Sequence, residues 1–367
     1  MKEYEKVYIS LIRNSLWDTK VEVPADFKDW SLVMRLAETQ ATQGSVTKGI
    51  LDCPEVLSHI SSKKQAELNN MLMTNVVMHS MANSAIQHIV MTLRKAGIEC
   101  ILLKGQGIAE NYTYPDLREC GDIDLYVGLE NYHKSYDVLK EFVDKIDDPS
   151  VLNGAGKHYH AKLSGISIEV HKFSEVLPSL KFDRIYQCHA SKGLTQDLVP
   201  VQLGETQVLT PSDNFNAFYI FNHLWTHFIS VGAGLRQVCD LTMFLHARSS
   251  YIDREYLRTI LIDMNLMKPW KIFGCVCVDI VGLPRDEFPF YESKYRKNAF
   301  RVTKHILVDG DLGRETGFIR KANRGLLIEK VFSLNFYLKR FCFTMTVFPK
   351  HALRQLYFSV INGFKNI

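Results

Sequence analysis

The chain has 367 residues, enough to bury a substantial core and to form two or three structural units. Its 44 Lys and Arg residues against 40 Asp and Glu residues give a formal net charge of +4. This small excess argues against a protein that coats nucleic acid, although it allows a local basic surface. The first 20 residues lack the apolar run of a signal peptide, and no later run is long enough to cross a membrane. We therefore expect a cytoplasmic protein.

The first segment, residues 1–96, carries helical patterns. Apolar residues recur at helical spacing, and 63–95 is predicted to form one long helix. Lys95 stands shortly before Gly97, and a basic residue followed by glycine is typical of a helix C-terminus. The sequence therefore predicts a helical N-terminal segment.

Short runs rich in β-branched and apolar residues mark the second segment, residues 97–178. They predict four strands, at 98–103, 122–127, 158–163 and 166–171. Only Ser164 and Gly165 separate the last two, which is typical of a tight hairpin. A helical pattern at 130–146 lies between the second and third strands. The segment is predicted to be a compact α/β unit with a small mixed sheet.

The third segment, residues 179–367, returns to helical patterns. Ser212 is the predicted N-cap of a helix that reaches Ser230, and 237–249 is predicted to form another helix. The predicted fold class is therefore α+β, with a small mixed β-sheet flanked by helical N- and C-terminal segments.

Two carboxylates stand in the predicted strand at 122–127. Side chains alternate between the faces of a strand, so Asp122 and Asp124 share one face while Ile123 and Leu125 share the other. Two acids held about 7 Å apart at their Cβ atoms repel each other unless a cation lies between them. Magnesium suits this position because it prefers oxygen ligands and is usually shared with substrate phosphates. We therefore expect Mg²⁺ or Mn²⁺ here.

A third acid stands in the predicted strand at 166–171, where Glu169 and His171 share a face. If this strand neighbours the earlier one, Glu169 joins Asp122 and Asp124, and the three acids can hold two metal ions. His171 is expected to orient Glu169 or to touch substrate. A structural alternative stays open, because an Asp after a glycine often ends a turn and paired surface acids are common.

The sequence LLKG at 102–105 ends a predicted strand in a sharp turn, and the residues after it can open a helix. A helix N-terminus presents free N–H groups to phosphate. Lys104 and Arg118 would add fixed positive charge, although each side chain is also compatible with an ordinary solvated or capping role.

The order ILLKGQGIAENYTYPDLRECGDIDLYV, then a helix, then ISIEVH resembles the poorly characterised bacterial nucleotidyltransferase family of the DNA polymerase beta-like superfamily. That family shares an LKG turn, an Arg shortly before a DIDLLV-like strand, and a later acid-x-His strand. The match is densest over residues 98–172. The later region at 221–246, with a His-rich helix and an Arg before an Asp-Leu helix, is also similar to the helical part of the family.

The resemblance implies roles for particular residues. The turn at Gly105 and Gln106 would hold the nucleotide phosphates, Asp122 and Asp124 would bind two metal ions, and Glu169 would complete the site. One departure is that Gln106 stands where the wider superfamily usually has Ser or Gly. The gap between the turn and the aspartates is also somewhat long.

The function implied by the resemblance is the metal-dependent transfer of an NMP from an NTP to an acceptor. The sequence does not select the NTP or the acceptor, which could be a protein side chain, a sugar, an antibiotic or other small molecule, or an RNA end. The alternative is a non-catalytic nucleotide-binding or protein-interaction module that retains the fold. The departure at Gln106 favours that alternative, whereas the intact acids favour an enzyme.

The acceptor side is expected to lie in the helical C-terminal region, because a sheet of this size offers little surface to enclose a second substrate. His223 and His227 lie one helical turn apart, and Arg236 precedes the next helix. We expect these residues to line the same cleft as Asp122 and Glu169. The alternative is that both histidines are packing residues between helices.

Two further features allow two interpretations each. His158 and His160 lie on one strand face, and this pair could ligate a metal or be hydrogen-bonded without one. The tail from Lys330 onward holds six Lys and Arg residues, interleaved aromatic residues and no Asp or Glu. It could make weak contact with an anionic partner or pack as an amphipathic helix.

Overall fold

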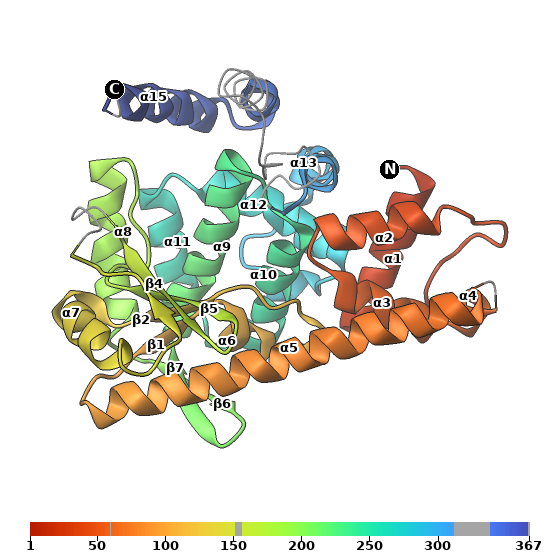
Figure 1. Ribbon diagram of the computed structural model, residues 1–367. Helices are drawn as coiled ribbons and strands as arrows, with labels where there is room; N and C mark the ends of the chain where they lie inside the picture. Colours follow the sequence, from red (N-terminus) through yellow and green to blue (C-terminus); the bar gives the residue numbers. More distant parts are fainter. Residues whose placement is uncertain (59, 151–155, 312–337, 366–367) are drawn as a thin grey trace. The chain divides into compact units, whose positions relative to one another are not determined.

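The structure is a computed structural model that describes residues 1–58, 60–150, 156–311 and 338–365 (Figure 1). The chain forms two compact units. Unit 1 comprises Met1–Thr42, Tyr219–His246 and Asn265–Ile367, and unit 2 comprises Gln43–Phe218 and Ala247–Met264. The predicted division of the chain into segments 1–96, 97–178 and 179–367 stays a prediction.

Unit 2 contains a seven-stranded mixed sheet. Its strands are β1 (Ile101–Leu103), β2 (Ile123–Tyr126), β3 (Lys145–Ile146), β4 (His158–Leu163), β5 (Ile166–His171), β6 (Val199–Leu203) and β7 (Thr206–Thr210). Their order across the sheet is β3-β4-β5-β2-β1-β7-β6. The pairs β2–β5 and β1–β7 are parallel, and the other neighbours are antiparallel.

Helices make up most of the remaining described chain. The helices within unit 2 are α3 (Gln43–Leu51), α4 (Pro54–Leu57), α5 (Ser62–Lys95), α6 (Gly105–Ala109), α7 (Gly128–Leu139), α8 (Leu180–Gly193) and α11 (Arg254–Asp263), with the short η1 (Pro115–Leu117) and η2 (Ser249–Tyr251). Those within unit 1 are α1 (Glu3–Trp17), α2 (Trp30–Thr39), α12 (Met267–Cys275), α13 (Arg296–Asp309) and α15 (Pro349–Lys365), with the short η3 (Val276–Val281), η4 (Arg285–Glu287) and η5 (Ser293–Tyr295). The residues of α9 (Asp213–Ser230) and α10 (Leu235–Arg248) are divided between the units, and 338–347 are also helical.

The predicted fold class is confirmed. All four predicted strands are present as β1, β2, β4 and β5. The helix predicted at 130–146 is α7, but it ends at Leu139, and the last two residues of the predicted helix form the strand β3 instead. The predicted turn of the β4–β5 hairpin is also present, with φ 50° at Ser164 and φ 83° at Gly165. These positive φ values match the turn type that two-residue hairpins favour.

The hairpin β6–β7 was missed, because the region after residue 179 was predicted to be helical throughout. Each of its strands has only five residues, and Pro200 weakens the strand pattern of β6. β6 lies at the edge of the sheet, where proline is tolerated. The hairpin matters for the fold because β7 pairs with β1 and extends the sheet beyond the predicted strands.

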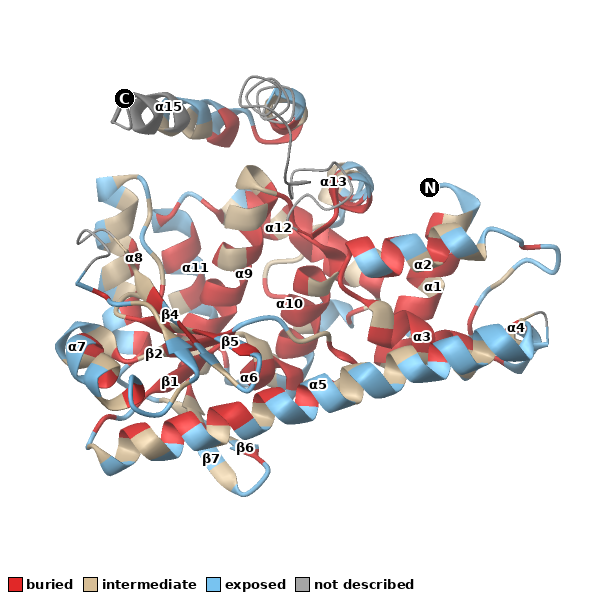
Figure 2. Cartoon of the chain, viewed as in Figure 1, coloured by how far each residue is buried: buried red, intermediate tan, exposed pale blue. Residues whose placement is uncertain are grey.

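The apolar face of the sheet packs against α5 and α7 (Figure 2). Strand residues such as Leu125, Ile168 and Val170 are fully buried in this core. From α5, Ile86 and Ile89 join them, one turn apart along the helix. Because alternate residues of each strand are buried in this core, the residues between them lie on the opposite, polar face of the sheet.

The ends of the long helices follow the predicted signals. α5 ends at Lys95, and Gly97 has φ 71°, a conformation that glycine adopts easily. Ser212 caps α9, because its Oγ accepts a hydrogen bond from the backbone N–H of Phe215 at 3.4 Å.

Unit 1 is built around an aromatic core. Trp225 and Phe228 from α9 contact Phe273 of α12 at ring-centroid distances of 6.5 and 5.3 Å. Trp270 is fully buried, and its indole N–H donates to the carbonyl of Pro289 at 2.7 Å. Buried aromatic pairs supply a large apolar area together with a preferred ring geometry.

The predicted basic aromatic tail is described only in part, because residues 330–337 lie outside the described residues. In the described part, Arg340 is buried and forms an ion pair with Asp309 of α13. The ring of Phe343 stacks on the ring of His305 at a centroid distance of 3.8 Å, and Phe348 is 1% exposed. These contacts agree with the packing interpretation, and contact with an anionic partner stays a prediction.

Among the helices that the structure describes, none combines the length and the apolar character that crossing a membrane requires.

Candidate active site

The chain makes a strained turn where β1 ends. Lys104 has φ 51° and ψ −144°, and Gly105 follows with φ 47°. A non-glycine residue in this region costs about 1–3 kcal/mol and persists only where the surrounding structure holds it. The Lys104 Nζ lies 3.1 Å from Asp124 Oδ2 in the neighbouring strand β2. The strained turn therefore places a cation against the acidic strand.

The three predicted acids lie together. β2 pairs with β5 in a register that sets Asp124 beside Glu169, as the sequence required for a shared site. Asp122 stands one residue before β2. One carboxylate oxygen from each of the three residues lies within 4.8 Å of the others. The two aspartates and Glu169 thus form one group on the polar face of the sheet.

Asp124 is the buried centre of this group, with a relative exposure of 4%. Its Oδ2 faces Lys104, and its Oδ1 accepts a hydrogen bond from His171 Nε2 at 2.9 Å. Burial opposes the charged form, but these two partners outweigh it and hold the pKa of Asp124 well below its usual range. The same ion pair raises the pKa of Lys104 against the effect of burial. Both side chains are therefore charged at neutral pH.

Asp122 and Glu169 occupy different environments. Asp122 reaches solvent at the rim of the sheet. Even so, partial desolvation and the negative charges of Asp124 and Glu169 raise the pKa of Asp122. Glu169 is half-buried, and there the hydrogen bond from His171 overcomes desolvation and lowers the pKa of Glu169. A bound cation would therefore stabilise the charged form of Asp122, the acid nearest to solvent, more than that of the other two acids.

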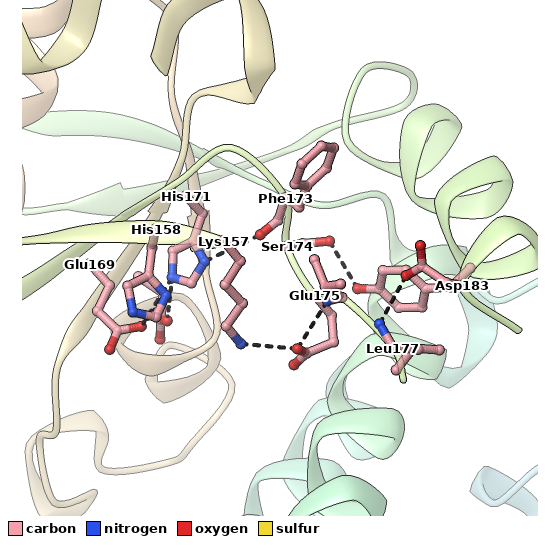
Figure 3. Close-up of polar contacts among 12 residues, drawn as sticks. Lys157, His158, Glu169, His171, Phe173, Ser174, Glu175, Leu177 and Asp183 are labelled. Atoms are coloured by element: carbon pink, nitrogen blue, oxygen red, sulfur yellow. Dashed lines mark hydrogen bonds and ion pairs between the residues drawn. The ribbon is translucent and has the colours of Figure 1, made fainter. Parts of the chain in front are cut away.

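His171 connects the acids to the loop that follows β5 (Figure 3). Its Nδ1 lies 3.3 Å from the carbonyl oxygen of Phe173, and its Nε2 faces both Asp124 and Glu169, the latter at 3.3 Å. Burial disfavours the imidazolium, but the two carboxylates outweigh this and raise the pKa of His171. His171 thus contacts both Asp124 and Glu169, and its role in orienting Glu169 or touching substrate stays a prediction.

Two more histidines face the same acid from β4. His158 is opposite His171 and His160 is opposite Glu169 in the β4–β5 register. The Nδ1 of His158 lies 3.2 Å from Glu169 Oε2, and that of His160 lies 3.7 Å from Glu169 Oε1. Burial lowers the pKa of His158 to about 4. Glu169 therefore has a nitrogen donor near each of its oxygens.

The chemistry of the donor set fits a divalent cation. Three carboxylates that converge on one face supply the oxygen ligands that Mg²⁺ and Mn²⁺ prefer. Lys104 and His171 offset part of the negative charge, yet the pKa of Asp122 is still raised. The residues present therefore fit the metal that the sequence predicted.

Gln106 is turned away from the acids. Its Nε2 donates a hydrogen bond to Asn83 Oδ1 at 2.9 Å and lies 3.1 Å from His79 Nδ1, and both partners belong to α5. Its Oε1 accepts a hydrogen bond from Cys120 Sγ at 3.4 Å. The side chain thus ties α6 to the long helix and to the loop before Asp122. If Gln106 contacts phosphate as predicted, its backbone N–H would make the contact.

Arg118 follows η1 and is 6% exposed. Its Nη1 donates a hydrogen bond to the carbonyl of Glu119 at 3.3 Å. The guanidinium thus has a local partner, and nucleotide binding by Arg118 stays a prediction.

The three residues predicted on the acceptor side belong to unit 1. His223 and His227 lie on α9 with their ring centroids 4.3 Å apart. Arg236 lies on α10, and its Nη2 is 3.3 Å from Asp311 Oδ2. The acids belong to unit 2, so a shared cleft stays a prediction.

Sequence reasoning missed an ion pair next to this site. Lys157 Nζ lies 3.0 Å from Glu175 Oε1, and this contact joins the start of β4 to the loop after β5 (Figure 3). Glu175 also helps to raise the pKa of Lys104. No pattern in the sequence marks either residue, because the loop that carries Glu175 has no regular spacing.

The sequence matches a known protein family. The model of the family described as "Uncharacterised nucleotidyltransferase" matches residues 26–282, well over half of the chain. The chain belongs to this family. Membership in the family supports a general nucleotidyltransferase role and implies an NTP as substrate. No curated protein matches the sequence.

Among solved structures, the chain is similar to the crystal structure of an antigenic nucleotidyltransferase-like protein from Paracoccidioides brasiliensis. The alignment covers 51% of this chain and 88% of that chain, at 12% sequence identity and a TM-score of 0.33. A likeness of this size carries no argument about fold or activity.

Proposed function

We propose that this chain transfers a nucleoside monophosphate from an NTP to an acceptor and releases pyrophosphate, with Mg²⁺ or Mn²⁺ as cofactor. The observation that carries the proposal is the convergence of Asp122, Asp124 and Glu169, whose ligand oxygens lie within 4.8 Å of one another beside the cationic Lys104. Family membership supplies the general class of reaction.

Asp122, Asp124 and Glu169 would hold the metal ions. When bound, these ions would neutralise the triphosphate and stabilise the attacking and leaving oxygens. The acceptor oxygen would form a bond to the α-phosphorus as the bond to the pyrophosphate oxygen breaks. Glu169 would help to remove the proton from the acceptor hydroxyl, because its half-buried carboxylate is charged and lies at the edge of the group.

The turn at Lys104 and Gly105 would hold the phosphates. Gly105 has no side chain, so the backbone can approach a phosphate closely. Because the side chain of Gln106 is bound to α5, its backbone N–H would make the contact at that position. Lys104 would turn from Asp124 toward the phosphates once a metal ion balances that carboxylate. Arg118 would supply further positive charge.

The acceptor side would involve His171 on the sheet and His223, His227 or Arg236 in unit 1. The acceptor could be a protein side chain, a sugar, a small molecule or an RNA end. Arg236 already has a carboxylate partner in Asp311, so it would have to bind the acceptor with its other guanidinium nitrogens.

The test is transfer of label from each α-³²P-labelled NTP in the presence of Mg²⁺ and a lysate of the source organism. We expect a labelled product with the wild-type protein and at least about a thousandfold less with Asp124→Asn. Asp137→Asn, at an exposed ion pair on α7, is the matched control and should label normally. Equal labelling by Asp124→Asn would contradict the mechanism.

A non-catalytic nucleotide-binding module is the second candidate, and one observation favours it. Lys104 and His171 already compensate Asp124, so the fold tolerates these acids without a metal ion. In that case the protein would bind NTP at equilibrium but would label nothing. Binding measured beside the transfer assay therefore separates the two functions.

A further inference from the structure

Three side-chain atoms that could bind a metal ion lie close together on the hairpin β4–β5, next to Asp122 and Asp124 (Figure 3). They are His158 Nδ1, Glu169 Oε2 and His171 Nε2. The Glu169 oxygen lies 3.2 Å from the His158 nitrogen and 3.3 Å from the His171 nitrogen. This set differs from the three carboxylates because two of its donors are imidazoles.

We propose that His158, Glu169 and His171 form a binding site for a borderline divalent transition-metal ion of the Zn²⁺ or Co²⁺ type. The site shares Glu169 with the acidic group but does not depend on nucleotide transfer.

The spacing of the donors matches such an ion. Zn²⁺ binds imidazole nitrogen and carboxylate oxygen at about 2.0–2.2 Å, so neighbouring ligands on a tetrahedron lie about 3.3–3.5 Å apart. The two observed separations, 3.2 and 3.3 Å, are close to this value. All three ligand atoms lie within 4.8 Å of one another, so the side chains already converge on one position.

His158 lacks the hydrogen bond that would otherwise explain its position. Its Nδ1 is buried and makes no hydrogen bond within the described part of the chain, although it lies in contact with Glu169. A buried polar atom of this kind requires an explanation, and a metal-binding role is one. A cation between the nitrogen and the carboxylate would satisfy both atoms.

The surroundings of His171 are those of a metal-binding histidine. Its Nδ1 faces the backbone carbonyl of Phe173, which orients the ring and leaves Nε2 for the ion. The ion would compete with Asp124 for Nε2, since these atoms are now 2.9 Å apart. Asp124 would keep Lys104 as its partner. The site can therefore fill without leaving a buried carboxylate unpaired.

Ligand type separates the two positions. Imidazole favours zinc, cobalt and related ions over magnesium, whereas carboxylates alone favour magnesium. Because Glu169 belongs to both sets, we expect the two ions to influence each other, and millimolar Mg²⁺ should weaken Co²⁺ binding without abolishing it.

The experiment is a titration of the full chain with Co²⁺ after metal removal, in millimolar Mg²⁺ and without nucleotide. Visible absorption bands of low-symmetry Co²⁺ are the readout, and calorimetry with Zn²⁺ is the second. We expect His158→Gln to raise the Kd for Co²⁺ at least about tenfold. His133→Gln, at an exposed histidine of α7, is the matched control and should change the Kd less than about twofold. Thermal unfolding should show that both variants are folded.

Asp122→Asn separates the new site from the acidic group, because it removes a carboxylate from that group alone. It should bind Co²⁺ at least as tightly as the wild type, because the variant holds the competing Mg²⁺ less well. The proposal is overturned if the wild type binds no Co²⁺ in Mg²⁺, if His158→Gln binds like the wild type, or if Asp122→Asn loses as much affinity as His158→Gln. An intense near-ultraviolet thiolate band would also overturn it, since that band would assign the ion to cysteines such as the exposed Cys188 and Cys342.

Discussion

The two faces of strands β2 and β5 differ in what holds their side chains. On one face, Leu125 and Ile168 are fully buried in the core formed with α5 and α7. On the other face, Asp124, Glu169 and His171 form a charged network. Burial of apolar side chains explains the first face completely. The second face concentrates charges that folding alone does not require, and this is the reason to look for function there.

We expect the largest loss of stability from a substitution on the apolar face. Leu125 is adjacent to Asp124 in β2 but points into the core with no exposed surface. Leu125→Ala should lower the free energy of unfolding by about 3 kcal/mol, because it removes buried methyl groups and leaves a cavity. Urea unfolding measures this change. A loss below about 1 kcal/mol would mean that this face is loosely packed.

A smaller loss is expected at the centre of the polar face. Asp124→Asn leaves the cations of Lys104 and His171 without their buried anion, and should cost about 2 kcal/mol. The exposed control Asp137→Asn should change the free energy of unfolding by less than about 0.5 kcal/mol. If the two variants were equally stable, Asp124 would not be the centre of the network.

Gly105→Ala tests the turn that follows β1. A Cβ at this position would lie 3.7 Å from the carbonyl oxygen of Asp122, an ordinary contact, so only the positive φ is costly. We expect a loss of about 1 kcal/mol in stability. The added methyl group would stand where phosphate approaches the backbone, and we expect the Kd for NTP to rise about tenfold. Unchanged NTP affinity would place the phosphates elsewhere.

The smallest effect is expected for Asp122→Asn, and its sign is opposite to that for Asp124. Because folding raises the pKa of Asp122, wild-type stability declines as the pH rises from the unfolded pKa of 3.8 through the folded value. Asparagine does not titrate. The variant should be more stable than the wild type at pH 7 by about 0.5 kcal/mol or less, since water screens this exposed position.

The gain from Asp122→Asn should shrink as the pH falls and should disappear well below the unfolded pKa of 3.8, where the wild-type carboxyl is protonated in both the folded and the unfolded state. Unfolding curves at a series of pH values measure the difference. A variant that is less stable at pH 7 would show that Asp122 has a favourable partner in the fold.

Much of this site could be predicted from local patterns. Alternation placed Asp122 and Asp124 on one face of their strand, with Glu169 beside them if the two strands are neighbours, and short-range turn signals identified the β4–β5 hairpin. The register of that hairpin could also be predicted from its turn. A two-residue turn at Ser164 and Gly165 sets His158 opposite His171, as observed.

Other features depend on long-range packing that the sequence does not display. The strand β7 joins β1 across more than a hundred residues, and no local signal predicts that pairing. The turn at Gly105 and Gln106 was expected to hold phosphate, and this stays a prediction, but the sequence did not reveal that the Gln106 side chain contacts His79 and Asn83 of α5. The position of a residue in a turn does not show whether its long polar side chain points toward a ligand or toward a neighbouring helix.

A crystal structure with Mn²⁺ and a non-hydrolysable NTP analogue, with the manganese located by anomalous scattering, would test most directly whether the three acids bind metal beside the nucleotide. We expect manganese bound to Asp122 and Asp124 and to phosphate oxygens of the analogue, with Glu169 as a further ligand. An analogue bound elsewhere, with these acids empty at saturating Mn²⁺, would contradict this expectation.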